Sequence, residues 1–137
     1  MLTEKTMLQN HLNSLMDVGI DQIIIINENG RADDWTFRNK IVLSRDKQEI
    51  FLMSVLLHHS MMRDFDGEFG PAECTIIERQ NIKLVSIPFY SYVVLAMMGK
   101  NVDHEFLVGR IHEIKNIHAN KLLEEKCLRM EVLANHG

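Results

Sequence analysis

Two segments of the chain are apolar without interruption, and they predict the centre of a β-sheet. The first holds the four consecutive isoleucines at positions 23–26, and the second spans residues 92–98. β-branched side chains suit a strand better than a helix, and a strand without polar alternation is covered on both faces. Residues 32–38, 74–79 and 82–87 mix polar with apolar side chains, so they predict more peripheral strands, with 32–38 at an edge of the sheet.

Apolar residues at helical spacing predict three helices around these strands. The first spans about residues 3–17, and Thr3 can act as its N-cap. The second begins near Asp46, is capped by Ser44 or Asp46, and runs to about Phe65. Asp103 can cap the third helix, which runs to about residue 133 and is either unbroken or interrupted near residues 116–120. The predicted order of elements is therefore α-β-β-α-β-β-β-α.

The second helix is apolar on almost every side. Ile50, Met53, Leu57 and Met61 form one stripe at about 100° per residue, and other apolar residues fill most of the remaining circumference. A sheet can cover only one side of such a helix. The other sides must be covered by a loop or helix of the same chain or by a second protein, and we favour the second protein because monomers rarely expose apolar patches of this size.

The charge balance and the cysteines narrow the classes of function. Fifteen Lys and Arg against nineteen Asp and Glu give a net charge of −4 without a basic run, so we expect no nucleic-acid binding. Cys74 and Cys127 are far apart and form no CxxC pair, which is typical of free thiols in the cytoplasm. No apolar run reaches the length of a membrane span, and the N-terminus has no apolar signal core. We therefore expect a cytoplasmic protein with no membrane partner.

No arrangement of residues in the sequence indicates catalysis, a metal site or a cofactor. His58 and His59 are adjacent, so on a helix they point about 100° apart and cannot share a metal ion directly. The acidic residues within positions 64–68 lack the spacing of a calcium loop and predict a solvated turn. The sequence contains no phosphate loop, dinucleotide fingerprint or nucleophile elbow. We expect a protein that is not an enzyme and that binds no cofactor.

The order of elements resembles that of the roadblock/LC7 (profilin-like) family over about residues 3–118. The resemblance rests on the first strand with its hairpin Glu28-Asn29-Gly30, on a second helix that begins near Asp46, and on the strand at residues 92–98 that leads into the last helix. It implies an α+β fold with a five-stranded antiparallel sheet, the first and fifth strands in the middle and helices on both faces. We expect this domain at residues 1–118, followed by a C-terminal helical extension at residues 119–137 that docks either on the core or on a partner.

The resemblance also implies a function in association. Roadblock-like domains pair through the second helix and the third strand, and many act as platforms for small GTPases or motor complexes. We therefore expect a non-catalytic scaffold or regulator, acting on a small GTPase or in a larger complex, that forms a homodimer or a heterodimer with a related chain. The expected interface residues are Phe51, Leu52, Val55, Leu56, His59, Met62, Thr75 and Ile77. The alternative function is that of a PAS- or GAF-like sensor that holds a small ligand between the sheet and the helix.

Overall fold

The computed structural model describes residues 3–16, 19–39 and 41–136 of the chain. Its elements, in chain order, are α1 (Glu4–Leu15), β1 (Ile20–Ile26), β2 (Ala32–Phe37), α2 (Arg45–Met62), η2 (Arg63–Phe65), α3 (Asp66–Phe69), β3 (Thr75–Glu78), β4 (Lys83–Phe89), β5 (Tyr92–Met98) and α4 (Glu105–His136). The predicted order is confirmed, with two short additions, η2 and α3, after α2. The predicted end of the first helix at residue 17, and residues 1, 2 and 137 of the predicted domain bounds, lie outside the described residues.

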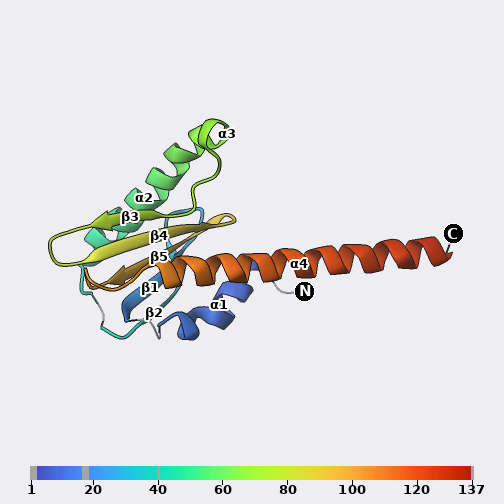
Figure 1. Cartoon of the computed structure of the whole chain (residues 1–137). Helices are drawn as coiled ribbons and strands as arrows, with labels where there is room; N and C mark the ends of the chain where they lie inside the picture. The colour runs from blue at the N-terminus through green and yellow to red at the C-terminus, as the bar shows by residue number, and fades with distance from the viewer. Residues whose placement is uncertain (1–2, 17–18, 40, 137) are drawn as a thin grey trace.

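The five strands form one antiparallel sheet in the order β2-β1-β5-β4-β3. β1 and β5, the two strands with unbroken apolar runs, pair with each other and leave β2 and β3 as the edges (Figure 1). The expected α+β fold, with the first and fifth strands inside the sheet, is therefore confirmed.

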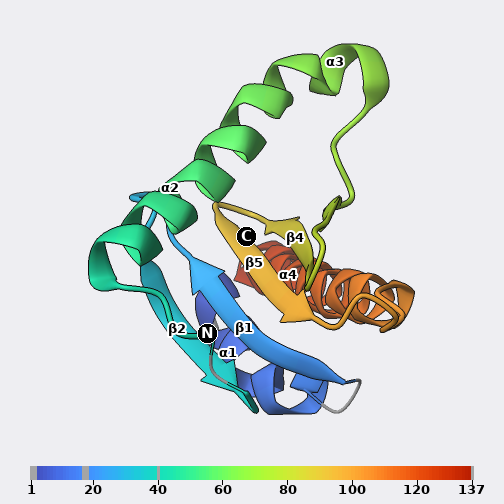
Figure 2. The ribbon, with the colours of Figure 1, turned by 90° about the vertical axis from the view of Figure 1, so that its left-hand side faces the viewer.

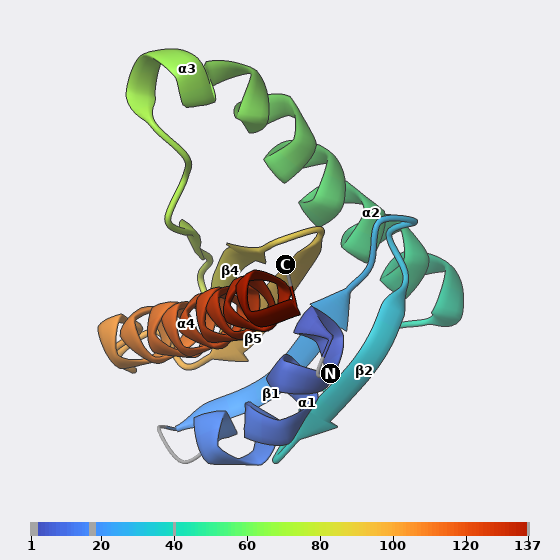
Figure 3. The same ribbon diagram turned by 90° about the vertical axis from the view of Figure 1, so that its right-hand side faces the viewer.

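Helices cover both faces of the sheet. α1 and α4 lie on one face (Figure 3), where Leu8, Leu15 and Ile111 pack with Ile23 and Ile25. α2 crosses the opposite face (Figure 2), where its Leu52 packs in a second cluster that contains the intervening isoleucines of β1. Successive side chains of a strand point to opposite faces. The isoleucine run therefore has no polar position because both of its faces are covered.

Of the three hairpins that join neighbouring strands, the β1–β2 and β4–β5 hairpins each contain a residue with positive φ. Gly30 takes a φ of 76° between β1 and β2, where the Asn27 side chain accepts hydrogen bonds from the backbone of Asn29 and Arg31. Tyr90 takes a φ of 56° between β4 and β5, a conformation that a bulky residue rarely adopts. The Asn-Gly hairpin is confirmed, and the β4–β5 hairpin is tighter than the sequence predicts because β4 continues through Pro88 to Phe89.

β4 is buried along most of its length, so the peripheral position predicted for it is wrong. The charged Lys83 misled the prediction, but its amine is satisfied inside the fold by the Val102 carbonyl and by His104 Nδ1. Pro88 is compatible with this strand because the pairing of β3 with β4 extends only to Ser86, so no ladder bond to β3 is missing at Pro88.

α4 is a single helix of 32 residues, so of the two predicted courses the unbroken one is correct. Its first half is buried on the sheet through Leu107, Ile111 and Ile114, and its second half projects beyond the sheet (Figure 1). The predicted extension from residue 119 is the continuation of this helix, with Leu123 and Leu133 among its exposed residues. In the part of the chain that the structure describes, no helix is long and apolar enough to span a bilayer.

Candidate functional site

α2 begins with local signals that fix its first turn. The Ser44 hydroxyl accepts a hydrogen bond from the Lys47 backbone N–H at 3.3 Å, and Asp46 lies in the first turn, where a negative charge is favourable. Of the two predicted caps, Ser44 is the one observed. The helix then runs for 18 residues, and the chain continues through η2 and α3 until Gly70, whose φ is 81°.

Two side chains hold α2 on the sheet. Among its described residues Leu52 and His59 are the buried ones, each 3% exposed. His59 Nε2 lies 2.7 Å from Ser86 Oγ of β4, and burial, followed by the charges of His58 and Arg63, lowers the pKa of His59 below its ordinary value of 6.5. Although a histidine beside a serine can act as base and nucleophile, both side chains here are shielded from solvent, so we assign the pair a structural role.

The side of α2 opposite the sheet carries the apolar stripe predicted from the sequence. Ile50, Met53, Leu57 and Met61 are all exposed, with Ile50 at 70% and Met61 at 68%. At about 100° per residue Ile50, Leu57 and Met61 lie roughly opposite Leu52, and Met53 lies between this side and one flank. The helix is therefore apolar both where it meets the sheet and where it meets solvent.

A third set of residues lies along the flank of α2 that faces the β3 side of the sheet. Phe51, on this flank, lines a groove together with Arg79 and Ile82 of the β3–β4 connection. On the other flank, Met53 lies against Gly30 of the β1–β2 hairpin. From Phe51 onward, apolar residues and one histidine recur at alternating spacings of four and three, and we call this set the seam: Phe51, Val55, His58, Met62, Phe65 and Phe69.

A seam with this spacing is typical of helices that pack against another helix. Its last two members, Phe65 and Phe69, stack with ring centroids 6.2 Å apart and planes inclined by 20°, and both are exposed. An exposed pair of stacked aromatic rings is characteristic of an interaction surface, because such rings offer a large contact area.

The edge strand β3 lies beside this flank. Thr75 pairs with Ser86 and Ile77 with Leu84, and residues directly opposite in a sheet point to the same face. Because Leu84 belongs to the cluster under α2, Thr75 and Ile77 also point to the α2 face. The outer side of β3 is unpaired within the sheet, so its backbone can bond another strand.

The structure places the eight predicted interface residues in three groups. Leu52 and His59 lie on the side of α2 that faces the chain's own sheet. Phe51, Val55 and Leu56 are half-buried and pack against the hydrophobic cluster that contains Leu52. Met62 and Ile77 are exposed, and Thr75 is half-buried at the edge. The exposed part of the predicted surface therefore lies along the seam and the β3 edge.

Sequence reasoning missed Phe65 and Phe69, because the acidic residues within positions 64–68 predicted a solvated turn, whereas η2 and α3 form there. The spacing of four between the two phenylalanines was the available signal, since it places both on one side of a helix. The short helix α3 forms here and brings them together.

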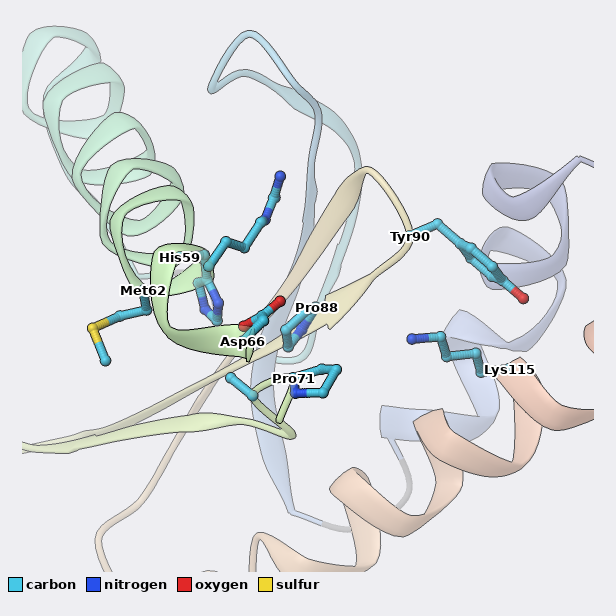
Figure 4. A pocket seen from close by; sticks show the side chains of 9 residues that line it. His59, Met62, Asp66, Pro71, Pro88, Tyr90 and Lys115 are labelled. Carbon is cyan, nitrogen blue, oxygen red and sulfur yellow. The ribbon is translucent and has the colours of Figure 1, made fainter. Parts of the chain in front are cut away.

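A polar cleft of about 250 Å³ lies where the end of α2 approaches the β4–β5 turn and α4 (Figure 4). Arg63 and Asp66 reach it from the α2 side, and Lys115 reaches it from α4. The Lys115 ammonium lies 5.3 Å from the centre of the Tyr90 ring, and partial burial, followed by the Glu4 carboxylate, raises the pKa of the Tyr90 phenol. The cleft offers charges of both signs for polar contacts, and its lining contains no serine, threonine or cysteine to act as a nucleophile.

Within residues 3–16, 19–39 and 41–136, no three side chains of His, Cys, Asp or Glu are grouped so that they could hold a metal ion. The arrangement around α2 and β3 offers exposed apolar area and a free strand edge, both of which suit contact with another protein. Binding through such a surface requires no reacting group.

Comparison with known proteins gives matches at the level of structure. No family model matches this sequence, and no curated protein matches it. A roadblock/LC7 domain from Streptomyces avermitilis superposes with a TM-score of 0.60 at 12% identity, over 82% of this chain and 94% of that one. Myxococcus xanthus MglB gives a TM-score of 0.62 at 12% identity, over 90% and 99%. An MglB with a tetrameric arrangement gives 0.64 at 7% identity, over 91% and 93%. At these identities the likeness concerns the fold, and it confirms the fold predicted from the sequence.

Proposed function

We propose that this chain, with its roadblock/LC7-like fold, is a non-catalytic scaffold or regulator that works as a homodimer. The observation that carries the proposal is α2, which is anchored to its own sheet by Leu52 and His59 and leaves its outer stripe and most of its seam exposed. Exposed apolar surface of this extent on a folded domain indicates a partner.

The dimer that we propose joins the two sheets and the two helices at once. The free edges of β3 pair antiparallel across a two-fold axis, and the seams of the two α2 helices pack against each other above them. His59 contacts Ser86 of β4, and Thr75 of β3 is the strand partner of Ser86, so this part of α2 lies above β4 with its seam towards the edge strand β3. One axis can therefore relate both the strands and the helices, as an isologous interface requires.

We further propose that the dimer presents its remaining apolar surface to a small GTPase or to a larger complex. Pairing along the seam would leave Ile50, Leu57 and Met61 uncovered, because they lie on the side of α2 away from the sheet. This outer stripe is the surface that we assign to the further partner. The tetrameric arrangement of one structural relative makes a second dimer another candidate for it.

The first experiment measures the mass in solution by light scattering on a sizing column over a dilution series. We expect twice the monomer mass, and we expect the variant Met62→Glu/Ile77→Lys to be monomeric and folded, because both side chains are exposed. Phe106→Glu on α4 is the matched control, since Phe106 is equally exposed but lies away from the seam. A wild-type protein that is monomeric at every concentration would contradict the proposal. Leu52→Glu is unsuitable as a test, because a buried charge unfolds the helix from its own sheet.

The GTPase part is tested separately with small GTPases of the same organism, loaded with GDP or with a non-hydrolysable GTP analogue. We expect binding to the wild-type dimer and loss of binding in Leu57→Glu/Met61→Glu, with the dimer intact. Equal binding by wild type and variant would show that the outer stripe is not the GTPase surface.

A further inference from the structure

An apolar groove lies beside Phe51, at one end of the seam. It has a volume of about 330 Å³, and its lining combines apolar side chains with two cations at the rim: Ile41, Leu43, Lys47, Phe51, Arg79, Ile82, Leu84 and Met97. The groove lies at the N-terminal end of α2, next to the β3–β4 connection. It has the size and the lining of a site that accepts one or two large apolar groups.

The exposed aromatic pair, Phe65 and Phe69, lies at the other end of the same flank. Phe69 is 82% exposed, and the two rings are held together by their stacking at the end of η2 and in α3. The stretch of α2 from Phe51 to Met62 alone spans about 17 Å at the helical rise, and η2 and α3 follow it before Phe69. One chain therefore carries an aromatic projection and an apolar groove that it cannot bring together itself.

We infer that Phe65 and Phe69 of one copy insert into the groove beside Phe51 of a second copy, and that each dimer contains two such contacts. The inference rests on the proposed dimer. In an antiparallel arrangement of two seams, Phe69 lies opposite the Phe51 of the other copy and Phe65 lies opposite Val55, because the spacing of the seam is the same in both directions. The occupant of the groove is thus a second copy of this chain.

The area of contact supports this occupant. A fully buried phenylalanine contributes about 150–250 Å². Phe65 is 48% and Phe69 82% exposed, so the four rings of a dimer can bury roughly 400–650 Å² of their own surface. A specific interface needs about 1,200–2,000 Å² in total. The two aromatic pairs would therefore supply about a third of that area, to which the groove, the seam and the strand edges add.

The test uses one variant for each side of the contact. Phe65→Ser/Phe69→Ser removes the aromatic pair, and Lys47→Trp fills the groove from an exposed position of α2. Neither change touches a buried side chain, and circular dichroism checks the fold. Phe106→Ser and Arg45→Trp are the matched controls, because both replace exposed residues that line neither the groove nor the seam.

Each single variant should raise the dimer dissociation constant at least about tenfold in sedimentation experiments, and the controls should leave it unchanged. A mixture of the two variants should form heterodimers in preference to either homodimer. In the heterodimer the aromatic pair of the groove-filled chain meets the open groove of the other chain, so one of the two contacts is restored. Native mass spectrometry with one isotopically labelled chain measures this preference.

The outcomes separate this inference from the proposed function. Two results would overturn the inference and leave the proposed dimer standing. One is a wild-type dimer whose dissociation constant is unaltered in both variants, and the other is a statistical mixture of homodimers and heterodimers. A monomeric wild type would overturn both. If the wild-type protein retains a small molecule and Lys47→Trp does not, the groove is a ligand site and the inference is overturned. If Phe65→Ser/Phe69→Ser fails to fold, cross-linking decides: after Cys74→Ser/Cys127→Ser, a chain with Phe69→Cys should be joined by a short bis-maleimide to a chain with Lys47→Cys.

Discussion

The contact between His59 and Ser86 joins the C-terminal half of α2 to the sheet, and its removal gives a stability change that can be worked out in advance. The Nε2 and Oγ atoms are 2.7 Å apart, and the two side chains are 3% and 6% exposed. Ser86→Ala leaves a buried imidazole nitrogen without a partner, which should lower the free energy of unfolding by about 1–3 kcal/mol. His59→Leu should cost a similar amount, because it strands the serine hydroxyl. The double variant should lose at least about 1 kcal/mol less than the sum of the two, since it leaves no unpaired group.

The same contact gives stability a defined pH dependence. The pKa of His59 is lowered in the folded chain from its ordinary 6.5, chiefly by burial and then by electrostatic interaction with His58 and Arg63, while Asp66 and Lys115 line the adjoining cleft. Above pH 6.5 the imidazole is neutral in the folded and the unfolded chain, and it adds no pH dependence. As the pH falls below 6.5, the unfolded chain binds a proton that the folded chain does not bind. The free energy of unfolding therefore falls by at most about 1.4 kcal/mol per pH unit, until the pH reaches the lowered pKa.

Urea unfolding followed by far-ultraviolet circular dichroism measures both effects. The protein concentration must be the same throughout, because association with a second copy also contributes to stability. We expect wild type to lose stability between pH 7.5 and pH 5.5 by more than His59→Leu does, and we expect His11→Gln on α1 to behave as wild type. Equal slopes for wild type and His59→Leu, or full additivity of the two single variants, would refute the buried neutral histidine.

Three further predictions concern the ends of α2, the first hairpin and the distal part of α4. Ser44→Ala should lower the free energy of unfolding by about 1 kcal/mol through loss of the N-cap, with Ser44→Thr retaining most of it, as measured by urea unfolding. Gly30→Ala should lower the free energy of unfolding by about 1–2 kcal/mol, because residue 30 has a φ of 76°. The new Cβ would also lie 2.7 Å from Met53 Cε. Adding Met53→Ala should therefore remove this close contact but leave the cost of the backbone conformation. Deletion of residues 123–137 should change the free energy of unfolding by less than about 1 kcal/mol, because Leu123, Met130 and Leu133 are exposed, and a larger loss in thermal unfolding would show that this segment docks on the core.

The parts of the fold that were predicted correctly are those in which one physical requirement decides the sequence. The isoleucine run of β1 faces a helical layer on both sides, so each of its positions has to be apolar. Gly30 is needed for a positive φ, and the Asn-Gly pair therefore marks the hairpin without ambiguity. The amphipathic patterns of α1 and of the first half of α4 follow from a single buried side.

The errors arose where a side chain satisfies two requirements at once. Lys83 is charged, which suggested a peripheral strand, yet its amine finds partners in the chain segment before α4 while its stem is buried. The predicted strand ended at residue 87, before Pro88, yet Pro88 lies within β4 at a point where β3 no longer pairs. In both cases tertiary contacts supply what the local pattern lacks, and those contacts cannot be derived from neighbouring residues in the sequence.

The candidate site could be assigned to α2 from the sequence, but not to one side of it. A helix with one buried side shows a strong contrast between apolar and polar positions, and the contrast fixes its orientation. α2 has apolar residues towards the sheet, along the seam and on the outer stripe, so the residues that anchor it, Leu52 and His59, do not stand out from those that we expect to meet partners. The weak contrast is itself informative, because α1 and the first half of α4, which also pack on the sheet, each have a single buried side. In a chain of otherwise clear patterning, a helix that is apolar on several sides indicates several contact surfaces, and only the packed structure shows which of them the chain covers itself.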